Sequence, residues 1–409
     1  MLFKNISHTL IVMVIAMLSS FIVTLLLGRS LSPSAFGEFT LLRQILLIGA
    51  TVSVFGLDLS FIKLYAGEVR PPKFIHHVAL AFIVIIGMTY AIIAALVYDI
   101  VGSRLYLLIG SVILSGITLY LAALLRVKGN YFLAQLFAAG WKILLLLGVG
   151  AVLLLGDSID IDTIYQLIFF SLLIFGLYIF RYSLGEDNQD PVPKKYLSYG
   201  ILFWVINSTG LISGGIDKLV IPLSFGKDIL GIYAAISFVF ITSFTMVGSA
   251  VGYVLFPKIS AGNRIQFSTL ALWLGALIAA MGFIFQVFGL SMVSMIFSGF
   301  YDEHITRVLI LCFTIIGTLQ IVHTIIHFVI SAKADKKHLI YYWGLTVFII
   351  FVFIGLTFLW EFTEVPVILY LALIVIVTKL MKITLMLGLT KRIYALPIKS
   401  VELEPNELE

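Results

Sequence analysis

Apolar runs of about twenty residues recur along the whole chain and constrain its fold more than any other feature. Hydrophobic residues make up 61% of the 409 residues, charged residues only 11%, and the mean hydropathy is +1.14. This leaves too little polar surface to cover a water-soluble globule of this length, so the surrounding solvent must be lipid. Lipid offers the backbone no hydrogen-bond partners, and the alternating pattern of a β-barrel is absent. The chain is therefore predicted to be an all-α polytopic membrane protein.

Twelve of these runs are long enough to cross about 30 Å of hydrocarbon as helices. Their ranges are 8–28, 38–60, 77–98, 105–125, 131–155, 163–183, 197–221, 230–256, 267–290, 305–332, 339–360 and 366–389. A polar stretch with two prolines separates the first six from the last six, as a linker would. We therefore expect an N-terminal six-helix lobe at 1–184, a cytoplasmic linker at 185–196, a C-terminal six-helix lobe at 197–390 and a cytoplasmic tail at 391–409.

The two halves carry similar segments at equivalent positions. The segment GRSLSPSAFGEFT at 28–40 compares with PLSFGKDILGIYA at 222–234, so that Gly37 corresponds to Gly231. In both, a short polar stretch is followed by an apolar residue, a glycine and an aromatic residue two positions on. Repeats of this length in a membrane chain frame a transport pathway between two helix bundles.

The basic residues indicate how the chain is oriented. If the N-terminus is cytoplasmic, most lysines and arginines of the loops lie inside, and the exceptions are Arg29, Arg104, Lys227 and Arg307. The positive-inside rule then places both termini in the cytoplasm, as an even number of helices requires. These anchoring residues also account for the net charge of +5, so no nucleic-acid partner is needed to explain it.

Ionisable side chains are rare inside the predicted spans and mark a candidate site, because a charge that faces lipid costs several kcal/mol. Lys142 lies near the middle of the fifth span, too deep to reach the headgroups comfortably. Arg43 lies one to two turns inside the outer end of the second span. Lys379 and Lys382 are three residues apart on the last span and share a face. We expect these four residues to form an interior cationic substrate-binding site.

Each of these residues also has an ordinary structural explanation. The two lysines of the last span could extend towards the cytoplasmic headgroups. Arg43 could pair with Glu38, and Lys142 could pair with Asp58 or another interior carboxylate. Lys142 is the strongest functional candidate, because its depth leaves the fewest other roles.

Small and polar residues gather at mid-depth in the first helix of each half. The seventh span contains them at 207–210 and 213–215, and the first span has Ser19, Ser20 and Thr24 at the same repeat offset. Such segments bend easily and expose backbone groups to a cavity, and matching interruptions in two repeats point to a binding site. We expect Ser20 and Asn207 to contact substrate; close packing of helices is the alternative explanation.

Five further residues are candidates for gating or ion coupling. Asp217 and Lys218 are adjacent near the outer end of the seventh span and could form a gate pair or an interfacial cap. Asp58 is the one deep carboxylate in the N-terminal half. His323 and His327 share a face of the tenth span, as a hydrogen-bonded pair or a proton relay would. Two histidines alone make a weak metal site, so neither a metal nor a cofactor is expected.

Four segments together resemble a known family. They are LGRSLSPSAFGEFTLLRQ at 27–44, ISGGIDKLVIPLSFGKDILGIYAAISF at 212–238, VGYVLFPKIS at 251–260 and MVSMIFSGFYDEHITRVLILC at 292–312. In this order and spacing they are similar to bacterial Wzx-type polysaccharide and O-antigen flippases, members of the multidrug/oligosaccharidyl-lipid/polysaccharide (MOP) exporter superfamily. The resemblance covers nearly the whole chain.

The resemblance implies two six-helix lobes arranged in a V-shaped bundle like that of MATE transporters, moving by alternating access. It implies that an undecaprenyl-pyrophosphate-linked oligosaccharide passes from the cytoplasmic to the outer leaflet of the bacterial inner membrane during polysaccharide biosynthesis. A glycan polymerase is the partner that it implies. In such flippases cationic residues of the cavity attract the anionic headgroup; here Lys142, Arg43, Lys379 and Lys382 fit that role by their depth, not by a motif.

Other branches of the superfamily give the alternative function. The lipid II flippase branch has two helices beyond twelve, which this chain lacks. The multidrug branch has twelve helices and an acidic cation site in the N-terminal lobe, where this chain offers only Asp58. The alternative is therefore an H⁺- or Na⁺-coupled multidrug or small-molecule antiporter that uses Asp58, His323 and His327. An enzyme is not expected, because the outside loops are short and no Walker-type nucleotide loop is present.

Overall fold

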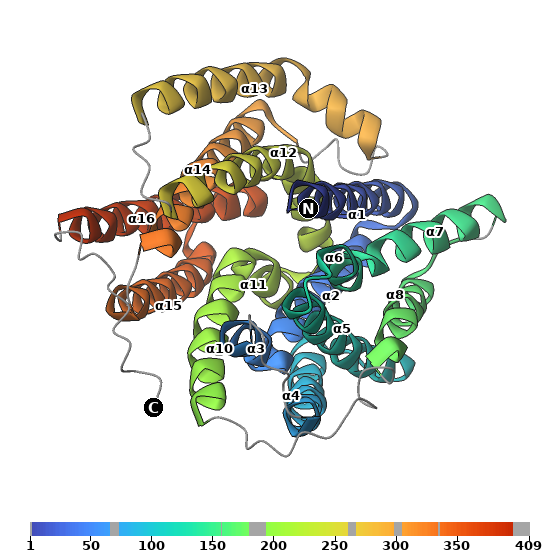
Figure 1. The fold of residues 1–409 in the computed structure, drawn as a ribbon. Helices are drawn as coiled ribbons and strands as arrows, with labels where there is room; N and C mark the ends of the chain where they lie inside the picture. The colour runs from blue at the N-terminus through green and yellow to red at the C-terminus, as the bar shows by residue number, and fades with distance from the viewer. Residues whose placement is uncertain are drawn as a thin grey trace.

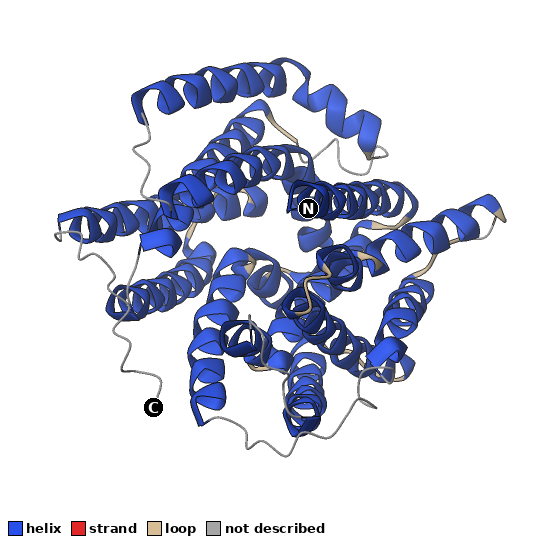
Figure 2. Ribbon diagram, viewed as in Figure 1, coloured by secondary structure: helices blue, strands red, loops and turns tan. Residues whose placement is uncertain are grey.

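The computed structural model describes residues 2–65, 73–156, 158–179, 194–260, 267–297, 305–333 and 336–395. This part of the chain is helical throughout and contains no strand (Figure 2). The helices of the N-terminal half are α1 (Leu2–Ser30), α2 (Pro33–Val54), α3 (Leu57–Tyr65), α4 (Lys73–Tyr98), α5 (Ser103–Val127), α6 (Tyr131–Ala139), α7 (Trp141–Leu154), α8 (Ile161–Gly176) and the 3₁₀ turn η1 (Leu177–Ile179).

The described residues of the C-terminal half are also helical. Its helices are α10 (Lys194–Gly214), α11 (Ile216–Ser224), α12 (Gly226–Ser260), α13 (Phe267–Ile296), α14 (Arg307–Lys333), α15 (Lys336–Phe358), η3 (Leu359–Phe362) and α16 (Val367–Ala395). Most of the predicted linker, at 185–193, and the tail beyond residue 395 lie outside the described residues.

The helices agree with the predicted spans. Ten helices of the described chain are long and apolar enough to cross a membrane, and the bent pair α6–α7 makes eleven. The sixteen-residue helix α8 is also apolar and continues directly into η1. Large apolar side chains such as Leu96, Leu154 and Phe351 are more than two-thirds exposed, as expected where lipid is the solvent. The prediction of an all-α polytopic membrane fold is confirmed.

The two halves form separate groups of helices that meet along α2, α10 and α12 (Figure 1). In the N-terminal half α5 packs against α2, α4, α6 and α8, and in the C-terminal half α14 packs against α12, α13 and α16. Between the halves, α2 packs against α12, while α10 packs against α2 and α3. The largest buried apolar cluster contains side chains from both halves. In this cluster the ring of Phe36, from the N-terminal half, lies 5.9 Å from the ring of Phe297, from the C-terminal half.

Three predicted spans are broken at a glycine. The second is interrupted at Phe55 and Gly56, both of which have left-handed backbone conformations, and the fifth bends by 46° at Gly140. The seventh is interrupted at Gly215, between α10 and α11, within the glycine-rich stretch that the sequence pointed to. The expected matching interruption in the first span is wrong, because α1 is continuous. Its Thr24 hydroxyl donates to the Ser20 carbonyl one turn earlier, which is compatible with an intact helix.

The chain reverses between α11 and α12. Residues sixteen positions apart lie about 24 Å apart along a straight helix, yet the Tyr233 hydroxyl donates a 2.8 Å hydrogen bond to the Asp217 carboxylate. The reversal occurs at Phe225 and Gly226, and the positive φ of 87° at Gly226 is a conformation that favours glycine. As a result α12 returns beside α11, and Tyr233 of α12 meets Asp217 of α11.

Candidate transport cavity

An ion network joins the two halves on the predicted outer side. The Glu38 carboxylate of α2 accepts from Arg104 of α5 and from Lys227 of α12, each at 3.0 Å. The Arg104 guanidinium also donates to both carboxylate oxygens of Asp162, at 2.6 and 2.9 Å. Both carboxylate oxygens of Glu38 are therefore hydrogen-bonded to these two partners, and the pairing with Arg43 that the sequence allowed is not seen among the described residues. We call Glu38, Arg104, Asp162 and Lys227 the outer network.

The backbones of α2 and α12 come into direct contact beside this network. A Cβ atom added to Gly37 would lie 2.0 Å from the Lys227 carbonyl oxygen, and one added to Gly231 would lie 1.9 Å from the Pro33 carbonyl oxygen. Gly37 and Gly231 are the equivalent glycines of the sequence repeat, as are Pro33 and Lys227 by position. The two repeats thus cross at matching residues, and we call this contact the outer crossing.

A second contact between the halves lies at the broken end of α2. The Trp204 indole of α10 donates a 3.0 Å hydrogen bond to the Val52 carbonyl, and its ring lies 4.9 Å from that of Phe55. A Cβ atom on Gly56 would lie 2.3 Å from the Gly200 carbonyl oxygen, so only glycine allows α10 to approach this closely. We call this the inner contact.

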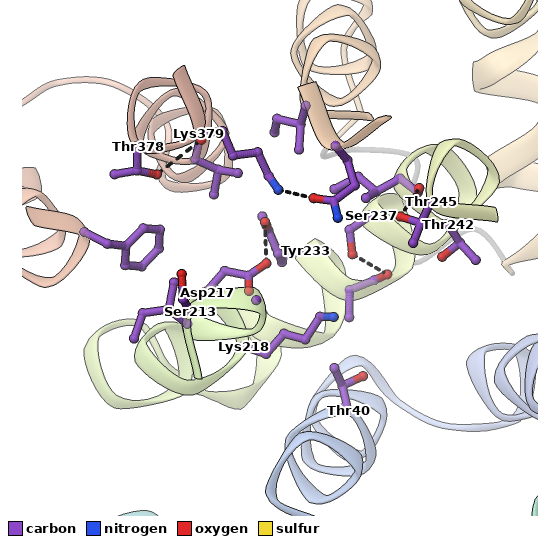
Figure 3. Close-up of a pocket in the computed structure, with 18 of the residues that line it drawn as sticks. Thr40, Ser213, Asp217, Lys218, Tyr233, Ser237, Thr242, Thr245, Thr378 and Lys379 are labelled. Carbon is purple, nitrogen blue, oxygen red and sulfur yellow. Dashed lines mark hydrogen bonds between the residues drawn. The ribbon is translucent and has the colours of Figure 1, made fainter. Parts of the chain in front are cut away.

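A cavity of about 390 Å³ is lined mainly by the C-terminal half. Helices α11, α12, α14 and α16 provide most of its polar side chains, and α1 and α2 of the N-terminal half contribute Thr24, Thr40 and Arg43. Figure 3 shows Lys218 and Lys379 directed into the open space beside Asp217 and Tyr233. The cavity therefore brings charged groups from three helices, α2, α11 and α16, to one place within the bundle.

The cations of the cavity have neutral hydrogen-bond partners. The Lys379 ammonium donates to the Gln320 side-chain oxygen, and the Lys382 ammonium donates to the Ser213 hydroxyl at 3.0 Å. On α2 the Arg43 guanidinium donates to a hydroxyl of α1, at 3.0 Å. None of these cations forms an ion pair within the described part of the chain.

The cavity consequently has an excess of positive charge. Its described lining contains four cationic side chains, namely Arg43, Lys218, Lys379 and Lys382. Asp217 is the one carboxylate among the same described residues, so the net charge is +3 with histidine neutral. Such a cavity attracts anions and repels cations.

Lys142, the strongest candidate by sequence, does not line this cavity. It lies with Arg43, Ser20 and Trp141 beside a much smaller gap of about 10 Å³ between α1, α2 and α7. Its ammonium lies 5.9 Å from the centre of the Trp141 ring. Lys142 and Ser20 thus lie near Arg43, which lines the cavity, but they do not line the cavity themselves.

Three other candidates also lie away from the cavity. Asp58 is in the first turn of α3, and no ion pair with Lys142 is seen in the described chain. Asn207 is half-buried on α10 and is not among the residues that line the cavity. The His327 ring nitrogen is 3.1 Å from the Tyr342 hydroxyl, and the ring stacks 6.3 Å from that of His323. Only His323 of the two histidines lines the cavity.

Several polar residues of the cavity were not expected as site residues. Tyr233, Ser213 and Gln320 all line it and bond to its charged groups. A signal for Gln320 was present, because it lies three residues before His323 and so on the same helix face. No group of three or more potential metal ligands occurs among the described residues.

Solved structures with the same fold are transporters. The lipid II flippase MurJ, in an inward closed conformation, matches 94% of this chain and 87% of its own with a TM-score of 0.69 at 12% identity. An inward-facing multidrug resistance MATE transporter of the MOP superfamily matches 95% of this chain and 98% of its own, with a TM-score of 0.62 at 13% identity. An outward-facing multidrug resistance MATE transporter of the MOP superfamily gives a TM-score of 0.59 at 13% identity and 96% coverage of both chains.

The sequence itself is distant from described families. No protein-family model matches the chain, and no curated protein matches it. At 12 to 13% identity the structural matches establish the fold alone. The chain is thus a polytopic membrane protein with the fold that the lipid II flippase and the MATE transporters of the MOP superfamily share.

Proposed function

We propose that this chain is a Wzx-type flippase of the bacterial inner membrane. It moves an undecaprenyl-pyrophosphate-linked oligosaccharide from the cytoplasmic to the outer leaflet by alternating access, with both termini in the cytoplasm. The oligosaccharide then becomes a substrate for a glycan polymerase on the outer side. The single observation that carries the proposal is the cavity, which has a net charge of +3 and, among the described residues, no ion-paired lysine.

The charge of the cavity favours an anionic ligand. Removing a charged group from water costs several kcal/mol unless a partner compensates for it, and like charges in one cavity repel each other as well. The hydroxyl and amide partners of Lys379 and Lys382 carry no opposite charge. A pyrophosphate would supply the missing negative charge and accept charge-assisted hydrogen bonds from several lysines at once.

The membrane potential can drive such a step. Outward movement of about two negative charges across an inside-negative potential of 100 mV releases roughly 4 to 5 kcal/mol. Hydrolysis of ATP is then unnecessary, which agrees with a sequence that has no Walker-type nucleotide loop.

The same cavity argues against a cation-coupled multidrug antiporter, although MATE transporters share the fold. Its one described carboxylate, Asp217, is already hydrogen-bonded to Tyr233, and Asp58 lies elsewhere. A cationic drug would enter a cavity that repels it.

Reconstitution in liposomes tests the proposal. The protein is incorporated with a dye-labelled polyprenyl-pyrophosphate saccharide, and the label that becomes accessible to an external reductant is measured over time. Wild-type protein should expose inner-leaflet label. The double variant Lys379→Ala/Lys382→Ala should do so at least about tenfold more slowly, because each charge-assisted hydrogen bond is worth about 1.5–3 kcal/mol.

Lys391→Ala is the matched control. This residue is an exposed lysine near the end of the same helix, α16, and lies outside the cavity. It should leave the rate unchanged. If wild-type liposomes transport no labelled glycolipid but exchange ethidium for H⁺ or Na⁺, the flippase proposal is wrong and the antiporter is correct.

A further inference from the structure

His323 lines the cavity, and its two ring nitrogens lack a hydrogen-bond partner among the described residues. Both nitrogens are buried and neither is bonded to another described group, although the side chain lines the cavity. A neutral imidazole has one donor and one acceptor nitrogen. Leaving such a group unsatisfied costs about 1–3 kcal/mol, and buried polar groups in native proteins are nearly always bonded. An unsatisfied imidazole beside a cavity is therefore a candidate for contact with a ligand.

The neighbouring histidine shows the contrast. His327 lies one turn further along α14, and its ring nitrogen is 3.1 Å from the Tyr342 hydroxyl of α15. It is not among the residues that line the cavity. The two histidines thus differ in their bonding: a ring nitrogen of His327 has a protein partner, whereas neither nitrogen of His323 has one among the described residues.

The groups around His323 are donors and cations. Gln320 lies three residues earlier on the same face of α14, and its side-chain oxygen already accepts from the Lys379 ammonium. Lys382 lies one turn beyond Lys379 on α16, and both lysines line the same cavity as the imidazole. A metal ion or organic cation is disfavoured here by two ammonium groups, whereas an anion with several acceptor oxygens suits all three donors.

We propose that His323, Lys379 and Lys382 form a phosphate subsite on α14 and α16, in which an imidazole N–H donates to a phosphate oxygen of the headgroup. This inference rests on the proposed function and assigns its anionic headgroup to one face of the C-terminal half. Gln320 holds Lys379 in place, and Ser213 holds Lys382, so both ammonium groups are positioned before the phosphate arrives.

The variant His323→Leu should weaken ligand binding without lowering the stability of the protein. Leucine is of similar size and removes the unsatisfied nitrogens, so thermal stability should be unchanged or raised. Affinity for farnesyl pyrophosphate, a soluble polyprenyl diphosphate, should fall about tenfold, the loss of one hydrogen bond to a charged group. Both are measured on the full-length protein in detergent, by calorimetric titration and by a melting curve. His323→Gln keeps an N–H donor and should recover part of the affinity.

His327→Leu is the matched control. It removes the group that faces the Tyr342 hydroxyl and should lower the melting temperature while leaving the affinity for farnesyl pyrophosphate unchanged. If the wild-type protein binds no farnesyl pyrophosphate, the flippase proposal itself fails. If the wild type binds it and His323→Leu binds equally well, only the phosphate subsite is refuted. A lower melting temperature for His323→Leu would likewise refute it, because the imidazole would then have a structural partner.

Discussion

The outer crossing predicts that one added methyl group at Gly231 opens the outer side. In Gly231→Ala the new Cβ atom would lie 1.9 Å from the Pro33 carbonyl oxygen, about 1.1 Å inside the 3.0 Å limit that real Cβ contacts observe. The obstructing atom belongs to the backbone, so no side chain can rotate to relieve the overlap. Helices α2 and α12 must separate at this point.

The size of the effect follows from the cost of overpacking. One extra methyl group in a well-packed contact costs about 1–3 kcal/mol, and a difference of that size changes a conformational equilibrium by about 5- to 150-fold. Because the overlap exists only where the two halves touch, the cost falls on the state that is closed outside. We therefore expect the population to shift towards the state that is open there.

Spin labels on either side of the crossing measure this shift. Ser34 at the start of α2 and Asp228 at the start of α12 are both exposed, and cysteines at these positions in a Cys312→Ala background can carry nitroxides. Pulsed dipolar spectroscopy of Gly231→Ala should show a new population at longer distance. Gly355→Ala on α15 is the control, since a Cβ atom there meets nothing within 4 Å. An unchanged distance distribution in Gly231→Ala would refute the reasoning.

Three further substitutions have definite expected results. Glu38→Gln leaves Arg104 and Lys227 without their shared negative charge, so the same spin-label pair should report outward opening, and the shift should shrink at high salt. Trp204→Phe removes the indole donor of the inner contact and should lower stability by about 0.5–1.5 kcal/mol, seen as a lower melting temperature. Asp58→Asn should leave transport of the labelled glycolipid unchanged in liposomes, because this carboxylate does not line the cavity.

The helical architecture was predictable because the length and composition of a membrane span appear directly in the sequence. The break at Gly215 was also indicated, since two consecutive glycines follow a row of small residues. The continuity of α1 was not predicted, because serine and threonine at mid-depth are compatible with an intact helix when their hydroxyls donate to a carbonyl one turn earlier. The reversal at Gly226 agrees with the predicted loop between the seventh and eighth spans.

The composition of the site was only partly predictable. Residue number gives the depth of a side chain along a span, and Lys379 and Lys382 indeed share a face and a cavity. Depth does not give the direction in which a face points, which depends on packing against other helices. Lys142 illustrates the limit: the 46° bend at Gly140 reorients α7, and its lysine faces a small gap beside the Trp141 ring. Glu38 belongs to the recognised repeat, but its partners come from helices far apart in sequence.

The cavity is distributed unequally between the halves, and this has a consequence for release. Lys218, Lys379 and Lys382 belong to the C-terminal half and keep their mutual distances if that half moves as a unit, whereas Arg43 belongs to the other half. Parting of the halves would withdraw Arg43 and lower the net charge around the ligand from +3 to +2. Under the proposed function, the movement that opens an exit for the anion would also weaken the attraction that retains it.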